Sequence, residues 1–336
     1  MNFIKRTISF IELGNRLKNL SPEAYDQIIE KAIYKNPWFT AENIKLALTG
    51  LINYLQEEKI NSWLDHYNLI DNPKKNIGVV MAGNIPMVGI HDFICILLSG
   101  HKIMAKLSSQ DEVLIPFIAN ELVKIEPKFK SQIDFVDQLK GIDAAIATGS
   151  DNTSRYFKYY FGKYPNIIRK NRTSIAILDG NESQENLRNL GRDIFSYFGL
   201  GCRNVSKLFL PRSILIEDII PHFEDYKLIG DHNKYNNNYF YNKSILLVNQ
   251  TEHFDSGFAL FQENENLASP ISMIYYEYYK DIEQLKNNLS LLDDKIQCKV
   301  SNMDTIPDKV VFGKAQMPEI WDYADNIDTM DFLLNL

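Results

Sequence analysis

The strongest constraint on the fold is an alternation of short apolar runs with helical segments. The run NIGVVMAG at 76–83 is continuous and ends in glycine, as a strand buried in a parallel sheet does. Pro86 suits the first turn of a helix that continues to Ser99, and HKIMAKLS at 101–108 predicts the next strand. This βαβ rhythm continues along the chain. It predicts an α/β fold with a doubly wound parallel sheet, followed by a second α/β domain.

The remaining elements follow from the same patterns. Ser21 and Thr40 are expected to cap two helices of a mostly helical N-terminal region. The Asn-rich tract at 233–242 predicts a polar surface loop. Further helices are predicted at 112–125, near 138–139, and at 152–161, 186–198, 217–223 and 280–292; further strands are predicted at 133–135, 144–148, 174–178, 207–210, 244–248, 259–261 and 271–276.

Composition excludes several classes of protein. The 336 residues carry a net charge of −7 with no block of Lys or Arg, which argues against a nucleic-acid partner. Cys95, Cys202 and Cys298 are odd in number and widely spaced, so they form neither a disulfide framework nor a metal site. No apolar stretch is long enough to span a bilayer, and the N-terminus lacks a signal peptide. We expect a cytoplasmic protein.

Polar residues follow three of the predicted strands, at the edge where such sheets bind ligands. Asn84 follows the first strand, and its amide can donate to a developing oxyanion. Lys106 and Ser108 end the second strand, where they can contact a cofactor. Thr148, Gly149, Ser150 and Thr153 lie at a helix start whose N–H groups suit phosphate. Taken singly, each stretch is also typical of an ordinary turn or helix cap.

Cys202 lies in the segment GLGCRNVSKLFL at 199–210. The glycines allow a substrate to approach the backbone closely, and the Cys202 N–H can donate to an oxyanion. Arg203 and Lys207 are predicted to favour the thiolate. Cys95, within FICILL, is expected in the core. The Cys202 setting therefore predicts a nucleophile.

In order and spacing, these segments resemble the aldehyde dehydrogenase superfamily. That family has an N-P turn, a K-P-S strand end, a T-G-S helix start and a nucleophile segment G-Q-x-C. Their counterparts here are Asn84-Ile85-Pro86, Lys106-Leu107-Ser108, Thr148-Gly149-Ser150 and Gly199 to Cys202. The GNIP and LASPI stretches and residues 314–333 are most similar to the acyl-CoA reductases of the LuxC family.

The resemblance implies a reaction. Cys202 would attack an acyl thioester, acyl-CoA, with the oxyanion held by Asn84 and the Cys202 N–H, and NADPH would reduce the acyl-enzyme to a fatty aldehyde. NADH remains possible as the cofactor. Lys106 and Ser108 would contact the adenosine side, and the loop from Thr148 to Ser154 the phosphates. His232 and His253 are candidate general acids by chemistry only.

Two departures bear on the chemistry. The position matching the water-activating glutamate of hydrolytic relatives is read as Ile177, with Asp179 and Glu182 nearby but out of register. The stretch that holds the nicotinamide ribose in the family is read as Asn266–Pro270. Oxidation of an aldehyde to an acid is therefore disfavoured. The alternatives are an acyl phosphate reductase, an aldehyde dehydrogenase or a non-catalytic nucleotide-binding relative.

The organisation expected from these features has four parts. Residues 1–75 form a helical flank of the cofactor domain, 76–185 the nucleotide-binding domain, 186–306 the catalytic domain, and 307–336 a C-terminal return segment. By resemblance, an acyl-transferring protein partner and a homo-oligomer are possible, with no metal.

Overall fold

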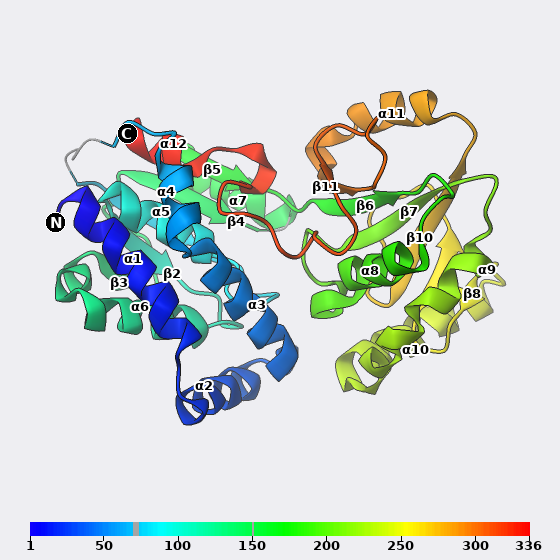
Figure 1. Cartoon of the computed structure of the whole chain (residues 1–336), viewed down its shortest axis with the longest axis horizontal. Helices are drawn as coiled ribbons and strands as arrows, with labels where there is room; N and C mark the ends of the chain where they lie inside the picture. The colour runs from blue at the N-terminus through cyan, green and yellow to red at the C-terminus, as the bar shows by residue number, and fades with distance from the viewer. Residues whose placement is uncertain (70–73, 150) are drawn as a thin grey trace. The chain divides into compact units, whose positions relative to one another are not determined.

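The computed structural model describes residues 1–69, 74–149 and 151–336. The chain forms two compact units, coloured by residue number in Figure 1. Unit 1 consists of Met1–Asn171 together with Pro318–Leu336, and unit 2 of Arg172–Met317. Both termini therefore belong to unit 1.

Unit 1 is built on a five-stranded parallel sheet in the order β3-β2-β1-β4-β5. The strands are β1 (Asn76–Val80), β2 (Lys102–Lys106), β3 (Ile133–Phe135), β4 (Ala144–Thr148) and β5 (Asn166–Arg169). The helices are α1 (Phe3–Lys18), α2 (Pro22–Lys35), α3 (Ala41–Tyr54), α4 (Glu57–Leu64), α5 (Ile90–Ser99), α6 (Leu114–Ile125), α7 (Asp151–Phe161) and α12 (Thr329–Leu334), with 3-10 turns at Pro127–Ser131 and Ala324–Asn326.

One core joins the N-terminal helices to this sheet. Buried side chains from α1 to α6, from the strands and from the C-terminal α12 form a single apolar cluster. The predicted caps are confirmed: Ser21 Oγ accepts from Ala24 N at 3.2 Å, and Thr40 Oγ1 from Asn43 N at 3.2 Å. The N-terminal helices thus share the core of the sheet.

Unit 2 has a seven-stranded sheet in the order β12-β11-β6-β7-β10-β9-β8, parallel except for the β8–β9 pair. The strands are β6 (Thr173–Ile177), β7 (Val205–Pro211), β8 (Phe254–Asp255), β9 (Leu260–Glu263), β10 (Met273–Tyr279), β11 (Ile296–Val300) and β12 (Lys309–Val310). The helices are α8 (Gln184–Phe195), α9 (Ile216–Ile219), α10 (Asn233–Val248) and α11 (Ile282–Ser290), with 3-10 segments at Ser196–Gly199, Ile220–Asp231 and Asp293–Lys295.

The boundary between the units differs from the expected one. Strand β6 pairs with β7 and β11, so it belongs to unit 2, and unit 1 ends at Asn171 rather than at residue 185. The return segment also divides, because 307–317 stays with unit 2 while 318–336 joins unit 1. Strand pairing sets the first boundary, and burial of Ile320, Met330 and Leu333 in the core of unit 1 sets the second; local sequence reveals neither.

Four local predictions were wrong. The tract at 233–242 and the expected strand at 244–248 form one helix, α10, because Tyr235, Tyr239, Asn242 and Leu246 recur at helical spacing and are buried. The described residues near 138–139 form no helix. Helix α5 begins at Ile90 rather than at Pro86, because Met87 in the preceding turn adopts a left-handed conformation (φ +59°) that a helix cannot include.

Candidate active site

The carboxyl edge of the unit 1 sheet contains a topological switch point. From β1 the chain moves to β2 and β3 on one side, and then returns to place β4 on the other side of β1. Open α/β sheets bind ligands at such a point, where the loops that leave neighbouring strands diverge. Asn84 follows β1, and Thr148 ends β4, so the sheet order places both at this switch point.

The turn that carries Asn84 is held by a buried carboxylate. Asn84 is exposed, while Gly83 before it and Pro86 and Met87 after it are buried. Asp111 Oδ2 accepts from Met87 N at 2.7 Å, and Asp111 Oδ1 from Leu114 N at 3.3 Å. Burial raises the pKa of Asp111 to about 6. Sequence patterns gave no sign of this residue, because its partner lies in another loop.

The loops after β1 and β2 are in close contact. A Cβ added at Gly83 would lie 2.7 Å from Ser108 Oγ and 3.1 Å from Asp111 N. Ser108 is half-buried, and its Oγ accepts from Gln110 N at 3.2 Å. Lys106 is exposed at the end of β2. The structure thus brings Ser108 to the Asn84 turn.

The start of α7 is the place where the sequence predicted phosphate contacts. Thr148, Gly149 and Thr153 are half-buried, and Ser150 lies outside the described residues. A Cβ added at Gly149 would lie 2.9 Å from Phe157 and 3.1 Å from Thr153. This position therefore accepts only glycine without rearrangement. Gly149 N donates to Arg169 O at 3.4 Å, so phosphate binding at this helix start stays a prediction.

Cys202 lies in a tight turn before β7. Its side chain is exposed, whereas Cys95 and Cys298 are buried. Asn204 N donates to Gly201 O at 3.0 Å, which places Cys202 and Arg203 at the two central positions of the turn. From β6, Ser174 Oγ donates to the Cys202 carbonyl at 2.9 Å. An exposed thiol on a fixed turn is accessible to a substrate.

The two predicted cationic helpers of Cys202 have other partners. The Lys207 side chain is buried, and its Nζ bonds Glu277 Oε2 at 2.5 Å and Glu265 O at 3.0 Å. Arg203 Nε donates to Ala315 O, which anchors the return segment. The Lys207 charge is thus paired with a carboxylate, and Arg203 is directed toward the backbone of the return segment. The prediction that they favour the thiolate finds no support.

The stretch at 266–270 does reach the nucleophile segment. Ser206 Oγ donates to Leu267 O at 2.7 Å, and Lys207 bonds the neighbouring Glu265 O.

The candidate general acids have structural partners: His232 Nδ1 accepts from Tyr235 N at 3.4 Å and caps α10, and His253 Nδ1 contacts Thr251 O at 2.8 Å. These contacts give both rings a role in the fold of unit 2.

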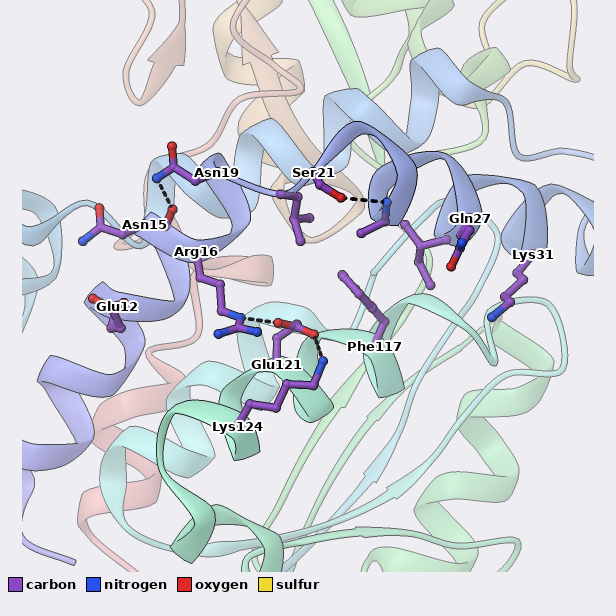
Figure 2. A pocket seen from close by; sticks show the side chains of 13 residues that line it. Glu12, Asn15, Arg16, Asn19, Ser21, Gln27, Lys31, Phe117, Glu121 and Lys124 are labelled. Atoms are coloured by element: carbon purple, nitrogen blue, oxygen red, sulfur yellow. Dashed lines mark hydrogen bonds and ion pairs between the residues drawn. The ribbon is translucent and has the colours of Figure 1, made fainter.

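Unit 1 also holds a separate polar cavity of about 670 Å³ between α1, α2 and α6. Figure 2 shows Arg16 and Lys124 reaching toward the buried Glu121 carboxylate, whose oxygens both groups bond. Its described lining includes none of the predicted site residues.

Within the described residues, no helix is both long and apolar enough to cross a membrane, and no cluster of His, Cys, Asp and Glu could hold a metal.

A family model for acyl-CoA reductase (LuxC) matches residues 10–218, which is more than half of the chain. The chain belongs to the LuxC acyl-CoA reductase family. The match covers the Asn84 turn, the ends of β2 and β4, and the Cys202 turn. No curated protein matches the sequence.

Solved structures similar to this LuxC family member are aldehyde dehydrogenases. Aldehyde dehydrogenase 21 from Physcomitrella patens is 11% identical, with a TM-score of 0.71 over all of this chain and 84% of that chain. A benzaldehyde dehydrogenase from Corynebacterium glutamicum is 11% identical, with a TM-score of 0.68 over 91% of this chain and 77% of that chain. The structure of a Bacillus cereus aldehyde dehydrogenase in complex with NAD+ is 11% identical, with a TM-score of 0.64 over 91% of this chain and 73% of that chain. At this identity the likeness shows the fold, as predicted.

The LuxC family member departs from the hydrolytic pattern at a different place from the one predicted. The strand that follows the Thr148–Gly149 helix start is β5, which the sequence patterns missed, and not β6. From Ile167 to Arg172, at the end of β5, the chain has no carboxylate. Ile177 lies buried in β6. The absence of a water-activating glutamate stays a prediction, and the segment that it concerns is 167–172 at the end of β5 rather than Ile177.

The carboxylates near Ile177 belong to a closed loop. Glu182 Oε1 and Oε2 accept from Asp179 N at 2.8 Å and Gly180 N at 3.0 Å, and burial raises the Glu182 pKa. The loop follows the carboxyl end of β6, whereas Cys202 precedes the amino end of the parallel β7. The loop and Cys202 therefore lie at opposite ends of the strands in the unit 2 sheet. Neither Asp179 nor Glu182 can activate water at Cys202 from there.

Proposed function

We propose that this protein reduces an acyl-CoA thioester to the aldehyde through a cysteine acyl-enzyme. Membership of the LuxC acyl-CoA reductase family and the aldehyde dehydrogenase fold support an oxidoreductase of this type. The observation that carries the proposal is the exposed thiol of Cys202, on a turn closed by Gly201 and Asn204, in a chain whose other cysteines are buried. A thiolate so placed is a suitable acyl acceptor.

The proposed reaction has two stages, acyl transfer to Cys202 and reduction of the acyl-enzyme. Cys202 Sγ bonds the acyl carbon as the carbon–sulfur bond to CoA breaks, and CoA leaves as a thiolate that takes up a proton. The Asn84 amide and the Cys202 N–H are the proposed donors to the oxyanion. When bound, a reduced nicotinamide nucleotide supplies the hydride to the acyl carbon. The bond to Sγ then breaks, which frees the aldehyde and restores the thiolate.

Unit 1 has features that fit such a nucleotide. The switch point between β1 and β4 is where such sheets bind ligands, position 149 accepts only glycine without rearrangement, and Lys106 offers an exposed cation. Lys106 and Ser108 are the proposed adenosine contacts, and Thr148, Gly149, Ser150 and Thr153 the proposed phosphate contacts. Some solved aldehyde dehydrogenases of this fold hold NAD+. We propose NADPH as the reductant, with NADH as the alternative.

The alternatives find less support. An acyl phosphate reductase needs a free anion site beside its nucleophile, but Lys207 bonds Glu277 and Arg203 bonds Ala315. An aldehyde dehydrogenase that forms an acid needs a base for water, and the end of β5 carries none. A non-catalytic relative has no need for an exposed thiol on a braced turn.

Intact-mass measurement on the purified protein tests the proposal. Wild type is mixed with a long-chain acyl-CoA beside Cys202→Ala, and NADPH is then added while the aldehyde is assayed. We expect one acyl group on wild type only, lost as NADPH is consumed and aldehyde appears. An adduct with acyl phosphate alone, or nucleotide binding with no adduct, would refute the proposal.

A further inference from the structure

The Asn204 side chain bonds both the turn of Cys202 and the end of α8. Asn204 is buried, and its Oδ1 accepts from Gly201 N at 2.8 Å. Its Nδ2 donates toward three carbonyls at the end of α8: Ser196 O at 2.8 Å, Ile194 O at 3.1 Å and Asp193 O at 3.2 Å. These carbonyls are among those left without a partner where a helix ends. Asn204 therefore ties the turn of Cys202 to the end of α8.

The chain between these two anchors is strained. Tyr197, Phe198 and Gly199 all adopt left-handed conformations, with φ of +53°, +60° and +74°. For the two aromatic residues this conformation is unfavourable, and such backbone persists only where its surroundings hold it. Burial of both rings helps, and Phe198 packs on His232 with ring centroids 4.3 Å apart. Asn204 spans the strained stretch, because it bonds Ser196 O directly before it and Gly201 N two residues after it.

The same side chain holds both ends of the turn that carries the nucleophile. Gly201 and Asn204 bond each other twice, through backbone N–H to carbonyl and through backbone N–H to Oδ1. Cys202 lies between them, with its carbonyl held by Ser174. The orientation of Sγ thus depends on a turn whose two ends both bond Asn204. Only a carboxamide offers an acceptor and two N–H donors in one short side chain.

We propose that Asn204 is the positioning residue of Cys202: it holds the Cys202 turn and the strained stretch before it, so that Sγ faces a bound acyl carbon. The inference rests on the proposed function only in taking acyl transfer as the reaction of Cys202. A loosened turn leaves substrate binding intact and misplaces the attacking atom. Small misplacements of reacting groups lower rates by on the order of a hundredfold.

Single-turnover acyl transfer tests this role. In Asn204→Ala we expect the rate at saturating acyl-CoA to fall at least about tenfold. The acyl-CoA concentration for half-maximal rate should stay within about threefold, because a positioning residue changes the rate of attack rather than the binding of substrate. The matched control is Asn242→Ala, which removes another buried asparagine of unit 2, bonded to Ile271 O at 2.8 Å. Equal loss in both variants, or full activity in Asn204→Ala, would overturn the inference.

A second variant and a second reagent keep the test decisive. Asn204→Asp keeps the acceptor for Gly201 N but turns an oxygen toward the α8 carbonyls, so it too should slow transfer; full activity would refute the role of the donors. Alkylation by iodoacetamide measures the reactivity of Cys202 without any assumption about the substrate of the protein. The pH profile of Cys202 alkylation should shift in Asn204→Ala and not in Asn242→Ala. If wild type is never acylated, the proposed function fails, and this profile alone decides the role of Asn204.

Discussion

The carboxylate of Asp111 accepts a hydrogen bond from the backbone N–H of Met87 at 2.7 Å, which joins the loop before α6 to the turn after β1. Met87 is left-handed, with φ +59°, and lies in the turn that carries the exposed Asn84. Asp111 therefore fixes this turn without using Asn84 itself. The geometry of the proposed nucleotide crevice depends on a buried charge from a neighbouring loop.

Asp111→Ala leaves the N–H groups of Met87 and Leu114 without this acceptor. Unpaired buried donors cost about 1–3 kcal/mol, so we expect the free energy of unfolding to fall by that amount. NADPH affinity should weaken as the turn relaxes. Asp134→Ala, which removes a partly exposed carboxylate paired with Lys102, is the control and should change little. Denaturant unfolding and fluorescence titration measure both effects; equal stabilities of the two variants would contradict the account.

Lys106→Ala should weaken NADPH binding by about tenfold or more, since a charged hydrogen bond contributes roughly 1.5–3 kcal/mol. Lys102 lies on the same strand but bonds Asp134 at 2.5 Å, so Lys102→Ala is the matched control. Titration of both nucleotides also shows whether Lys106 discriminates NADPH from NADH. The same affinity in the two lysine variants would remove Lys106 from the proposed site.

Burial raises the pKa of Asp193 to about 6, although Gly313 N and Ala315 N donate to it at 2.6 and 2.9 Å. A folded-state pKa above the unfolded value of about 3.9 means that the folded protein binds this proton more tightly. The stabilisation is fully present below about pH 4 and is lost as pH rises through 6. Relative to the Asp193→Asn variant, wild type should lose roughly 3 kcal/mol between about pH 4 and pH 7. Parallel pH–stability curves for the two proteins would contradict this linkage.

Aldehyde oxidation should depend on free CoA. Because the end of β5 carries no carboxylate, the acyl-enzyme formed from aldehyde and NADP+ has no base to activate water. Without CoA we expect at most one turnover per Cys202, and with CoA continued formation of NADPH and acyl-CoA. Steady production of free acid in the absence of CoA would show that another group activates water.

Only Cys202 should react with iodoacetamide in the folded protein. It is exposed, whereas Cys95 and Cys298 are 0% and 4% exposed. Burial also raises the pKa of Cys95 well above its usual value, so its thiolate is scarce. Intact mass should show one adduct under native conditions and three after unfolding in denaturant. Early modification of Cys95 or Cys298 would indicate local opening of the core.

Much of this protein could be predicted from local sequence. The apolar runs of β1, β2 and β4 and the Ser21 and Thr40 caps are local signals, because a strand period or a capping oxygen acts within a few residues. The ordered motifs around Asn84, Lys106, Thr148 and Cys202 predicted the family and the fold. Helix α10 was missed because its buried face is made of tyrosines and an asparagine, which give no apolar period.

The rest was decided by tertiary structure. The assignment of β6 to the second sheet follows from its pairing with β7 and β11. Lys207 was predicted to help Cys202, but it is buried against Glu277, which lies 70 residues further along the chain. Asp111 and Asn204 brace the two candidate loops through bonds that a sequence pattern does not encode. Local propensities act along the chain, whereas burial, pairing and the partner of each charge depend on which distant segments meet when the core forms.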